Sequence, residues 1–169
     1  MRSFTYEEID ALWRHKADME PEEAQPLVEA MGSAQPAILT YLLASGDDIL
    51  TEMERQVTFF MGVLLWHVIS ELAKENIREL STDELIETED KNFQMLEYLA
   101  GEPDSEFMTT VARIMENYNQ ATLLQYIIER IMEEPDKDIE LYDNHVGMMV
   151  IYLKSVIDCF DKTPEQLNS

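Results

Sequence analysis

Three carboxylates at helical spacing are the first residues of this chain whose arrangement could do chemistry: Glu84, Glu87 and Asp90. Residues three positions apart lie on one side of a helix, so all three groups can face one ion. Carboxylate oxygens, with water and substrate phosphates, are the ligands that Mg²⁺ prefers. The spacing is therefore compatible with a magnesium site. Because the chain has 35 acidic residues, such spacings also arise by chance, and a solvated helix face is the simpler interpretation.

This pattern resembles the carboxylates with which all-helical nucleotide pyrophosphohydrolases hold magnesium. The resemblance implies a second acidic pair on a neighbouring helix and a Lys or Arg that binds phosphate. Asp158 and Asp161 supply the pair if the fold brings them close. The sequence contains no Gly-rich phosphate loop and no Ser or Cys nucleophile elbow. Magnesium-dependent nucleotide hydrolysis is therefore kept as an alternative function.

A second candidate pair is His67 and Glu71, which lie one helical turn apart. Such a pair could ligate a metal or act as a base. A zinc site usually takes three or four protein ligands, and besides carboxylates the chain offers only His15, His67, His145 and Cys159. No H-E-x-x-H or C-x-x-C occurs, so a histidine satisfied within the protein is the preferred interpretation. We expect no cofactor.

The densest polar cluster runs from Asp136 to His145. A calcium loop that began at Asp136 would need Gly at its sixth position and Glu at its twelfth. The chain has Leu141 and Gly147 at those positions, so the cluster does not match an EF-hand. It is interpreted as a capped helix start with solvated charges.

The fragment D-N-H-V-G-M-M over residues 143–149 resembles the D-H-x-G segment of the all-helical redox-enzyme maturation chaperones. The resemblance covers about a dozen residues and departs at Asn144, because the family has Asp directly before its His. It implies an all-helical chaperone as a further alternative function.

The core that must position these groups is centred on the stretch from Val57 to Ile69, in which ten of thirteen residues are apolar. The run is long and lacks alternation, so it predicts a helix, and a helix that is apolar all round must be covered by other helices. It is too short to cross a bilayer, which takes about 20 residues. We expect the helix to extend from about 49 to 76, with Asp47 or Asp48 as its cap. The residues expected to be mostly buried in this helix and in the last long helix are Phe60, Leu64, Trp66, Ile69, Met149, Leu153 and Val156.

Capping and breaking residues predict seven or eight helices in a single all-α domain, 1–169. Thr5 with Glu8 forms a capping box, and Pro21 and Pro36 suit the first turns of helices. Other helices are expected to begin at Ser81 and at Glu102-Pro103-Asp104, to cover 123–132, and to run from about 138 to 160. Gly (5) and Pro (6) are too scarce for the turns of an all-β chain.

A shift of 85 residues superimposes parts of the two halves, 1–84 and 85–169. One interpretation is an internal duplication with two four-helix halves around the two apolar helices. The other is that two unrelated core helices have similar composition. In a duplication, the two glycines would let the apolar helices approach closely, which would offset the roughly 1 kcal/mol that glycine costs in a helix. The matching pairs are Gln35–Leu43 with Gln120–Ile128, Gly62 with Gly147, and Ser70 with Ser155.

The formal net charge is 12 − 35 = −23. A surface this acidic repels phosphate and anionic membranes, so we expect neither nucleic acid nor a membrane as a partner. Basic proteins, cationic ligands and metals remain, and solubility alone also accounts for the charge. The single cysteine, Cys159, excludes an internal disulfide, and the N-terminus has no apolar signal region. We expect a cytoplasmic protein.

No set of catalytic residues is specified, whereas the apolar core and the acidic surface are. The sequence therefore favours a protein that acts through protein–protein interaction without catalysis of its own. The expected partner is a basic protein or a basic helix, bound less tightly as salt rises. A second copy of the chain, met through a Met-rich or aromatic patch, is the alternative partner and would make a homodimer.

Overall fold

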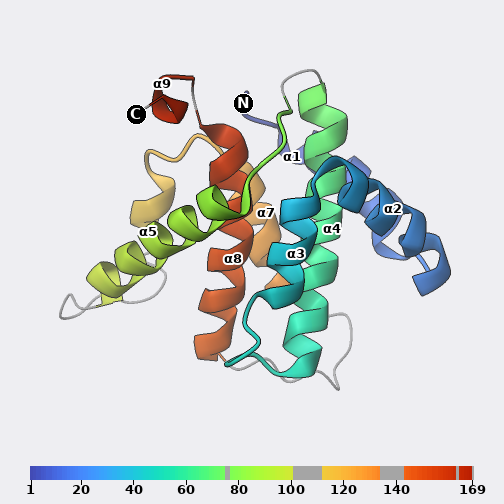
Figure 1. Ribbon diagram of the computed structural model, residues 1–169, viewed down its shortest axis with the longest axis horizontal. Helices are drawn as coiled ribbons and strands as arrows, with labels where there is room; N and C mark the ends of the chain where they lie inside the picture. The colour runs from blue at the N-terminus through green and yellow to red at the C-terminus, as the bar shows by residue number, and fades with distance from the viewer. Residues whose placement is uncertain (75–76, 101–111, 134–142, 163, 169) are drawn as a thin grey trace.

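The computed structural model describes residues 1–169 except 75–76, 101–111, 134–142, 163 and 169 (Figure 1). All regular structure in the described residues is helical, which confirms the all-α prediction. The helices are α1 (Tyr6–Ala17), α2 (Pro21–Ala34), α3 (Pro36–Ala44), α4 (Glu52–Ala73), α5 (Thr82–Ala100), α7 (Ala121–Met132), α8 (Asp143–Asp161) and α9 (Pro164–Leu167).

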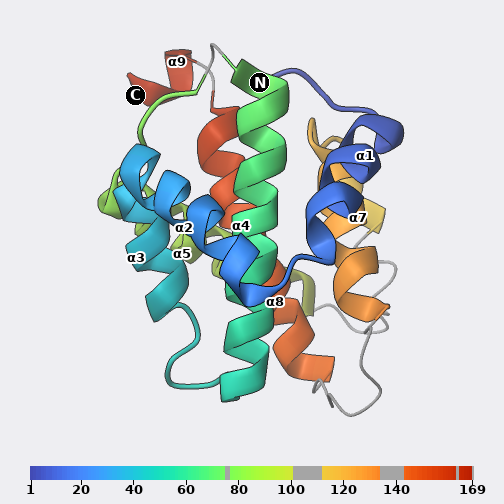
Figure 2. The same ribbon diagram turned by 90° about the vertical axis from the view of Figure 1, so that its right-hand side faces the viewer.

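Helices α4 and α8 form the centre of the molecule and run side by side in the same direction (Figure 1). Helices α1, α2 and α3 pack against α4, and α5 and α7 pack against α8. Two further contacts join helices that are far apart in the sequence, α1 with α7 and α3 with α5. Figure 2 shows α1 and α7 on one side of α4, with α2 and α3 on the other.

Helix α4 begins later than the sequence predicts and is capped by a different residue. Its N-cap is Thr51, whose hydroxyl accepts from the Glu54 backbone N–H while the Glu54 carboxylate accepts from the Thr51 backbone N–H. This reciprocal capping box satisfies two helix-end donors, so neither Asp47 nor Asp48 is the cap. At the other end Lys74 has a φ of 39°, which ends the helix at Ala73.

Six of the seven positions of the predicted core are buried, and the seventh, Phe60, is partly buried and packs against the core. Leu64, Ile69, Met149, Leu153 and Val156 are at most 1% exposed, and Trp66 is buried and stacks on a C-terminal aromatic ring. Phe60 is only half-buried and lines a cavity between α1, α4 and α7. The prediction that α4 is covered on every side is therefore wrong along the face that carries Phe60.

The two glycines of the proposed repeat are not equivalent in packing. A Cβ at Gly62 would lie 2.4 Å from Cδ1 of Leu42, so this glycine lets α3 approach α4. A Cβ at Gly147 would meet no heavy atom of the described chain within 4 Å. The expected close approach of the two apolar helices at their glycines is therefore wrong.

Several helix starts agree with their sequence signals. Thr5 and Glu8 form the predicted capping box, and Pro21 and Pro36 occupy the first turns of α2 and α3. The residue before α3 is Gln35, which is buried and uses its side chain elsewhere rather than as a cap. The start of the helix predicted at 102–104 and most of the 136–145 cluster lie outside the described residues, whereas residues 112–115 of that helix are helical.

By length and composition, α4 could span a membrane: it has 22 residues and a mean hydropathy of 1.4 over its most apolar part. The argument that its apolar run is too short therefore does not hold for the whole helix. In the fold, however, α1, α2, α3 and α8 all pack against it. The core helix of a soluble protein has this character, and the arrangement is consistent with one.

The central position of α4 predicts a large difference between two leucine truncations. Leu65→Ala, at a position with 0% exposure, should lower the free energy of unfolding by about 2–5 kcal/mol through lost burial and a residual cavity. Leu43→Ala, at a side chain 55% exposed, is the matched control and should cost roughly 0.5 kcal/mol or less. Urea unfolding measures both, and equal costs would contradict the assigned core.

Candidate functional site

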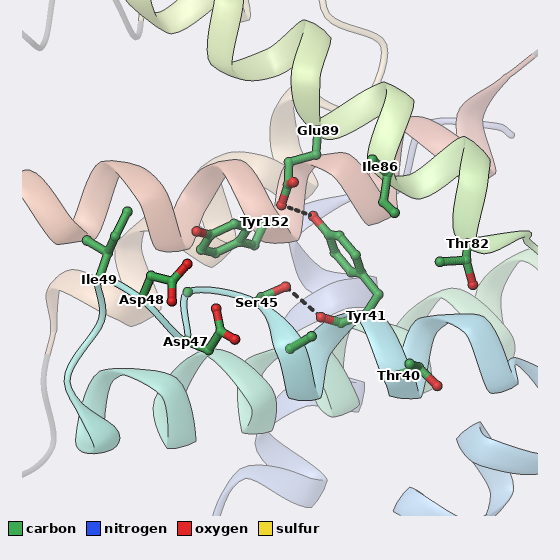
Figure 3. Close-up of a pocket in the computed structure, with 12 residues that line it drawn as sticks. Thr40, Tyr41, Ser45, Asp47, Asp48, Ile49, Thr82, Ile86, Glu89 and Tyr152 are labelled. Atoms are coloured by element: carbon green, nitrogen blue, oxygen red, sulfur yellow. Dashed lines mark hydrogen bonds between the residues drawn. The ribbon is translucent and has the colours of Figure 1, made fainter.

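A cavity of about 300 Å³ lies where α3, α5 and α8 meet the loop that follows α3 (Figure 3). We call it the carboxylate cavity. Its walls carry three carboxylates and two tyrosines, and none of its lining residues, all within the described chain, is Lys, Arg or His. The residues that give it this character are Tyr41, Asp47, Asp48, Glu89 and Tyr152.

Tyr41 and Glu89 join two helices across this cavity. The hydroxyl of buried Tyr41, on α3, donates to a carboxylate oxygen of Glu89 on α5 at 3.0 Å (Figure 3). Burial raises the pKa of Glu89, the tyrosine bond partly offsets that effect, and neighbouring Asp90 raises the pKa further. Burial also raises the pKa of Tyr41. The Glu89 carboxyl thus has one neutral donor, Tyr41, and no cation among the residues that line the cavity.

The loop after α3 presents the other two carboxylates. The Ser45 hydroxyl donates to the Tyr41 backbone carbonyl at 2.7 Å, and Gly46 turns the chain with a φ of 72°. A side chain at Gly46 would collide with Leu50, whose backbone N–H bonds to the Gly46 carbonyl. Because this turn is fixed at both ends, the exposed Asp47 and Asp48 are held at the mouth.

The electrostatics of the cavity favour a cationic group. Burial raises the pKa of the Tyr152 hydroxyl, and the charges of Glu89, Asp47 and Asp48 raise it further, so their field reaches across the cavity. Tyrosine rings can also attract cations through their faces. At the rim, Ile49 and Ile86 are 50% and 47% exposed. A cation carried on an apolar stem would match both features.

The sequence marks this site only weakly. The segment Ser45-Gly46-Asp47-Asp48 reads as a turn, and nothing in it points to Glu89, which lies about 40 residues further along. The sequence contains one indication of this site, because Tyr41 lies in an otherwise aliphatic stretch and matches Tyr126 at the shift of 85 residues. A tyrosine at both positions suggests a polar partner for each hydroxyl.

The predicted magnesium ligands are partly brought together. Glu84 and Glu87 of α5 line a second cavity, of about 610 Å³, with Asp158 and Asp161 of α8. The fold thus supplies the second acidic pair, and Lys91 and Lys162 also line this cavity. The third predicted ligand, Asp90, is exposed and does not line it.

These carboxylates already have partners in the protein. Arg78 donates two bonds to Glu84 and, although burial opposes the effect, holds the pKa of that carboxyl below its usual value. Asp158 accepts from the Tyr118 hydroxyl and from Lys154. Asp161 accepts from two amide side chains, and Lys91 pairs with Glu87 at 2.9 Å. In the described part of the chain, no three His, Cys, Asp or Glu side chains are placed to share a metal ion.

The other predicted ligands are dispersed. His67 is half-buried, and burial lowers its pKa while nearby Glu71 opposes the shift. His145 lies 2.9 Å from the oxygens of the fully buried Glu54, so this pair joins the first turns of α8 and α4. Cys159 is buried, which raises the pKa of its thiol to about 11.

Comparison with known proteins adds no relative, since no protein-family model, no curated protein and no solved structure matches the chain. The fold and the cavity define an all-helical protein with an acidic, tyrosine-walled recess, and its function has to be argued from these residues.

The Tyr41–Glu89 bond predicts the direction of a pKa change. Tyr41→Phe removes the hydrogen bond that lowers the pKa of Glu89, so that pKa should rise further above its usual value. Carboxyl ¹³C NMR over a pH titration measures it. Tyr6→Phe, at a ring on α1 outside this cavity, is the control and should leave Glu89 unchanged. A Glu89 pKa that falls or stays constant in Tyr41→Phe would contradict the assigned bond.

Proposed function

We propose that this protein acts through protein–protein interaction and that the carboxylate cavity receives a lysine or arginine side chain of a basic partner segment. The observation that carries the proposal is the composition of the cavity wall, three carboxylates and two tyrosines without a basic residue. A cation entering this recess would remove the mutual repulsion of the carboxylates. It would also lower the raised pKa of Glu89, which favours the charged carboxylate.

Several contributions support a cationic side chain over a bare ion. Hydrogen bonds to charged groups contribute about 1.5–3 kcal/mol each. A cation over a tyrosine face adds about 0.5–2 kcal/mol, depending on exposure. The stems of Lys and Arg are apolar and can lie along exposed Ile49 and Ile86. A metal ion would gain nothing from these isoleucines.

The charge of the whole molecule supports the same partner class. A net charge of −23 attracts basic surfaces and accelerates their encounter, while it repels nucleic acid and anionic lipid. In this proposal the long-range electrostatic field attracts basic partners, and the carboxylate cavity binds a cationic side chain that has an apolar stem. The protein needs no cofactor for this role, and a cytoplasmic setting suits it.

We also propose that the fold consists of two related halves, as an internal duplication implies, with the second half beginning before Arg78 rather than at residue 85. Arg2 and Arg78 support this, because each makes a two-bond ion pair with the glutamate six residues later, Glu8 and Glu84 respectively. In both places the glutamate also accepts from the backbone at the start of the next helix, α1 in one half and α5 in the other. The packing pattern agrees: α1 covers α4 as α5 covers α8.

Bonds between the halves support the same relation. Gln35 and Gln120 are both buried and immediately precede α3 and α7. The Gln35 side-chain amide donates to the Arg78 backbone carbonyl at 2.8 Å, and that of Gln120 donates to the Arg2 carbonyl at 2.9 Å. Tyr126 repeats the role of Tyr41, since its hydroxyl donates across to a carboxylate on α1 at 2.8 Å.

The interaction proposal predicts a site-specific loss of basic-peptide binding. The variant Asp47→Asn/Asp48→Asn/Glu89→Gln should bind an oligolysine peptide roughly tenfold or more weakly than the wild type, because the cavity loses its charged acceptors. The control Glu29→Gln/Glu97→Gln/Glu116→Gln removes the same charge from exposed positions and should bind almost as the wild type does.

Calorimetry at low and high salt measures both variants. Affinity should fall as salt rises, because the Debye length shortens from about 10 Å at 0.1 M to about 3 Å at 1 M. Equal losses in the two triple variants would mean that the peptide responds to overall charge, and the cavity proposal would be wrong.

A further inference from the structure

A third cavity, of different character, lies between α1, α4 and the end of α7, with a volume of about 420 Å³. We call it the arginine cavity. Its volume and its largely apolar lining are those of a small-molecule site. The apolar residues that line it are Trp13, Ala17, Val57, Phe60, Met61 and Leu64.

The exposed apolar face of α4 points to an apolar occupant. Val57, Phe60 and Met61 are only half-buried, although they belong to the most apolar run of the chain. The other faces of this helix are covered by α1, α2, α3 and α8. Apolar surface left open to water is unfavourable in proportion to its area. An apolar chain or ring in the cavity would remove that surface from water.

Two arginines line this cavity in a chain that has few basic residues. Only 12 of 169 residues are Lys or Arg, yet Arg14 and Arg130 both line this cavity. Lys16 follows in the same last turn of α1, and its charge contributes to the lowered pKa of His67 on α4. Two carboxylates also line the arginine cavity, so the formal charges of its lining residues sum to zero. The lining residues of the carboxylate cavity, by comparison, carry three carboxylates and no basic group.

Arg130 is the residue best placed to bind an anionic group. Its guanidinium lies over the Tyr126 ring at 4.7 Å from the centroid and bonds through Nη2 to Glu133 at 2.8 Å. Its Nε–H is buried and has no acceptor among the described residues. Glu133 is an exposed residue, so a ligand carboxylate can compete with it for the guanidinium.

From the apolar wall and this arginine we infer that the arginine cavity binds a small amphipathic carboxylate. The hydrocarbon part would lie on Phe60, Met61 and Val57, and the carboxylate would pair with Arg130 at the mouth. This site is independent of the carboxylate cavity, because α1, α4 and α7 form it and α3, α5 and α8 form the other. The two cavities nevertheless occupy corresponding places in the two proposed halves.

Octanoate and 1-octanol, titrated by calorimetry into the whole chain, test the inference. Octanoate should bind at one site per chain, roughly tenfold or more tightly than the alcohol, because only the carboxylate pairs with Arg130. Arg130→Gln should abolish this preference and leave two weak, similar affinities. Lys91→Gln is the charge-matched control outside the cavity and should bind octanoate as the wild type does.

Ala17→Phe tests occupancy without altering charge. Ala17 is half-buried and lines the cavity, so a phenyl group there should fill it and reduce the binding of both molecules at least tenfold. If Arg130→Gln does not fold, Ala17→Phe alone tests whether octanoate binds in the arginine cavity. Wild-type affinity in Ala17→Phe, equal binding of acid and alcohol, or no saturable binding of octanoate would each overturn the inference.

Discussion

Helix α4 cannot face water along most of its length, and the rest of the structure depends on covering it. Four helices, α1, α2, α3 and α8, pack against it. At Gly62 the absence of a side chain admits Leu42 of α3. Coverage is incomplete along the apolar face that carries Val57, Phe60 and Met61. The same constraint thus explains both the compact core and the apolar wall of the arginine cavity.

Buried polar groups hold the covering helices in place and thereby set the walls of both cavities. Gln35 and Gln120 bridge segments far apart in the sequence by donating to backbone carbonyls. Tyr41 and Tyr126 each donate to a carboxylate on a facing helix. Since a buried donor without an acceptor is costly, each of these bonds fixes the position of one helix against another. We propose that two related halves thereby carry cavities of opposite preference, one for cations and one for carboxylates.

The sequence predicted what depends on local chemistry. The capping box at Thr5, the prolines that begin α2 and α3, and the buried positions on α4 and α8 follow from short-range rules. The cap of α4 was missed because Asp47 and Asp48 compete with Thr51 in sequence, and only the turn at Gly46 decides between them.

The cavities could not be predicted, because their walls join residues from three helices. The repeated ion pairs could not be recognised from the sequence for a related reason. Arg2 and Arg78 differ by 78 − 2 = 76 residues and Gln35 and Gln120 by 120 − 35 = 85, so no single shift aligns both pairs.

NMR titration with n-butylammonium, with 1-butanol as the neutral control, measures whether the carboxylate cavity selects a cation on an apolar stem. We expect saturable shifts at Tyr41, Tyr152 and the Glu89 carboxyl with the ammonium alone. Shifts spread over the acidic surface without saturation, or the same shifts with butanol, would contradict it.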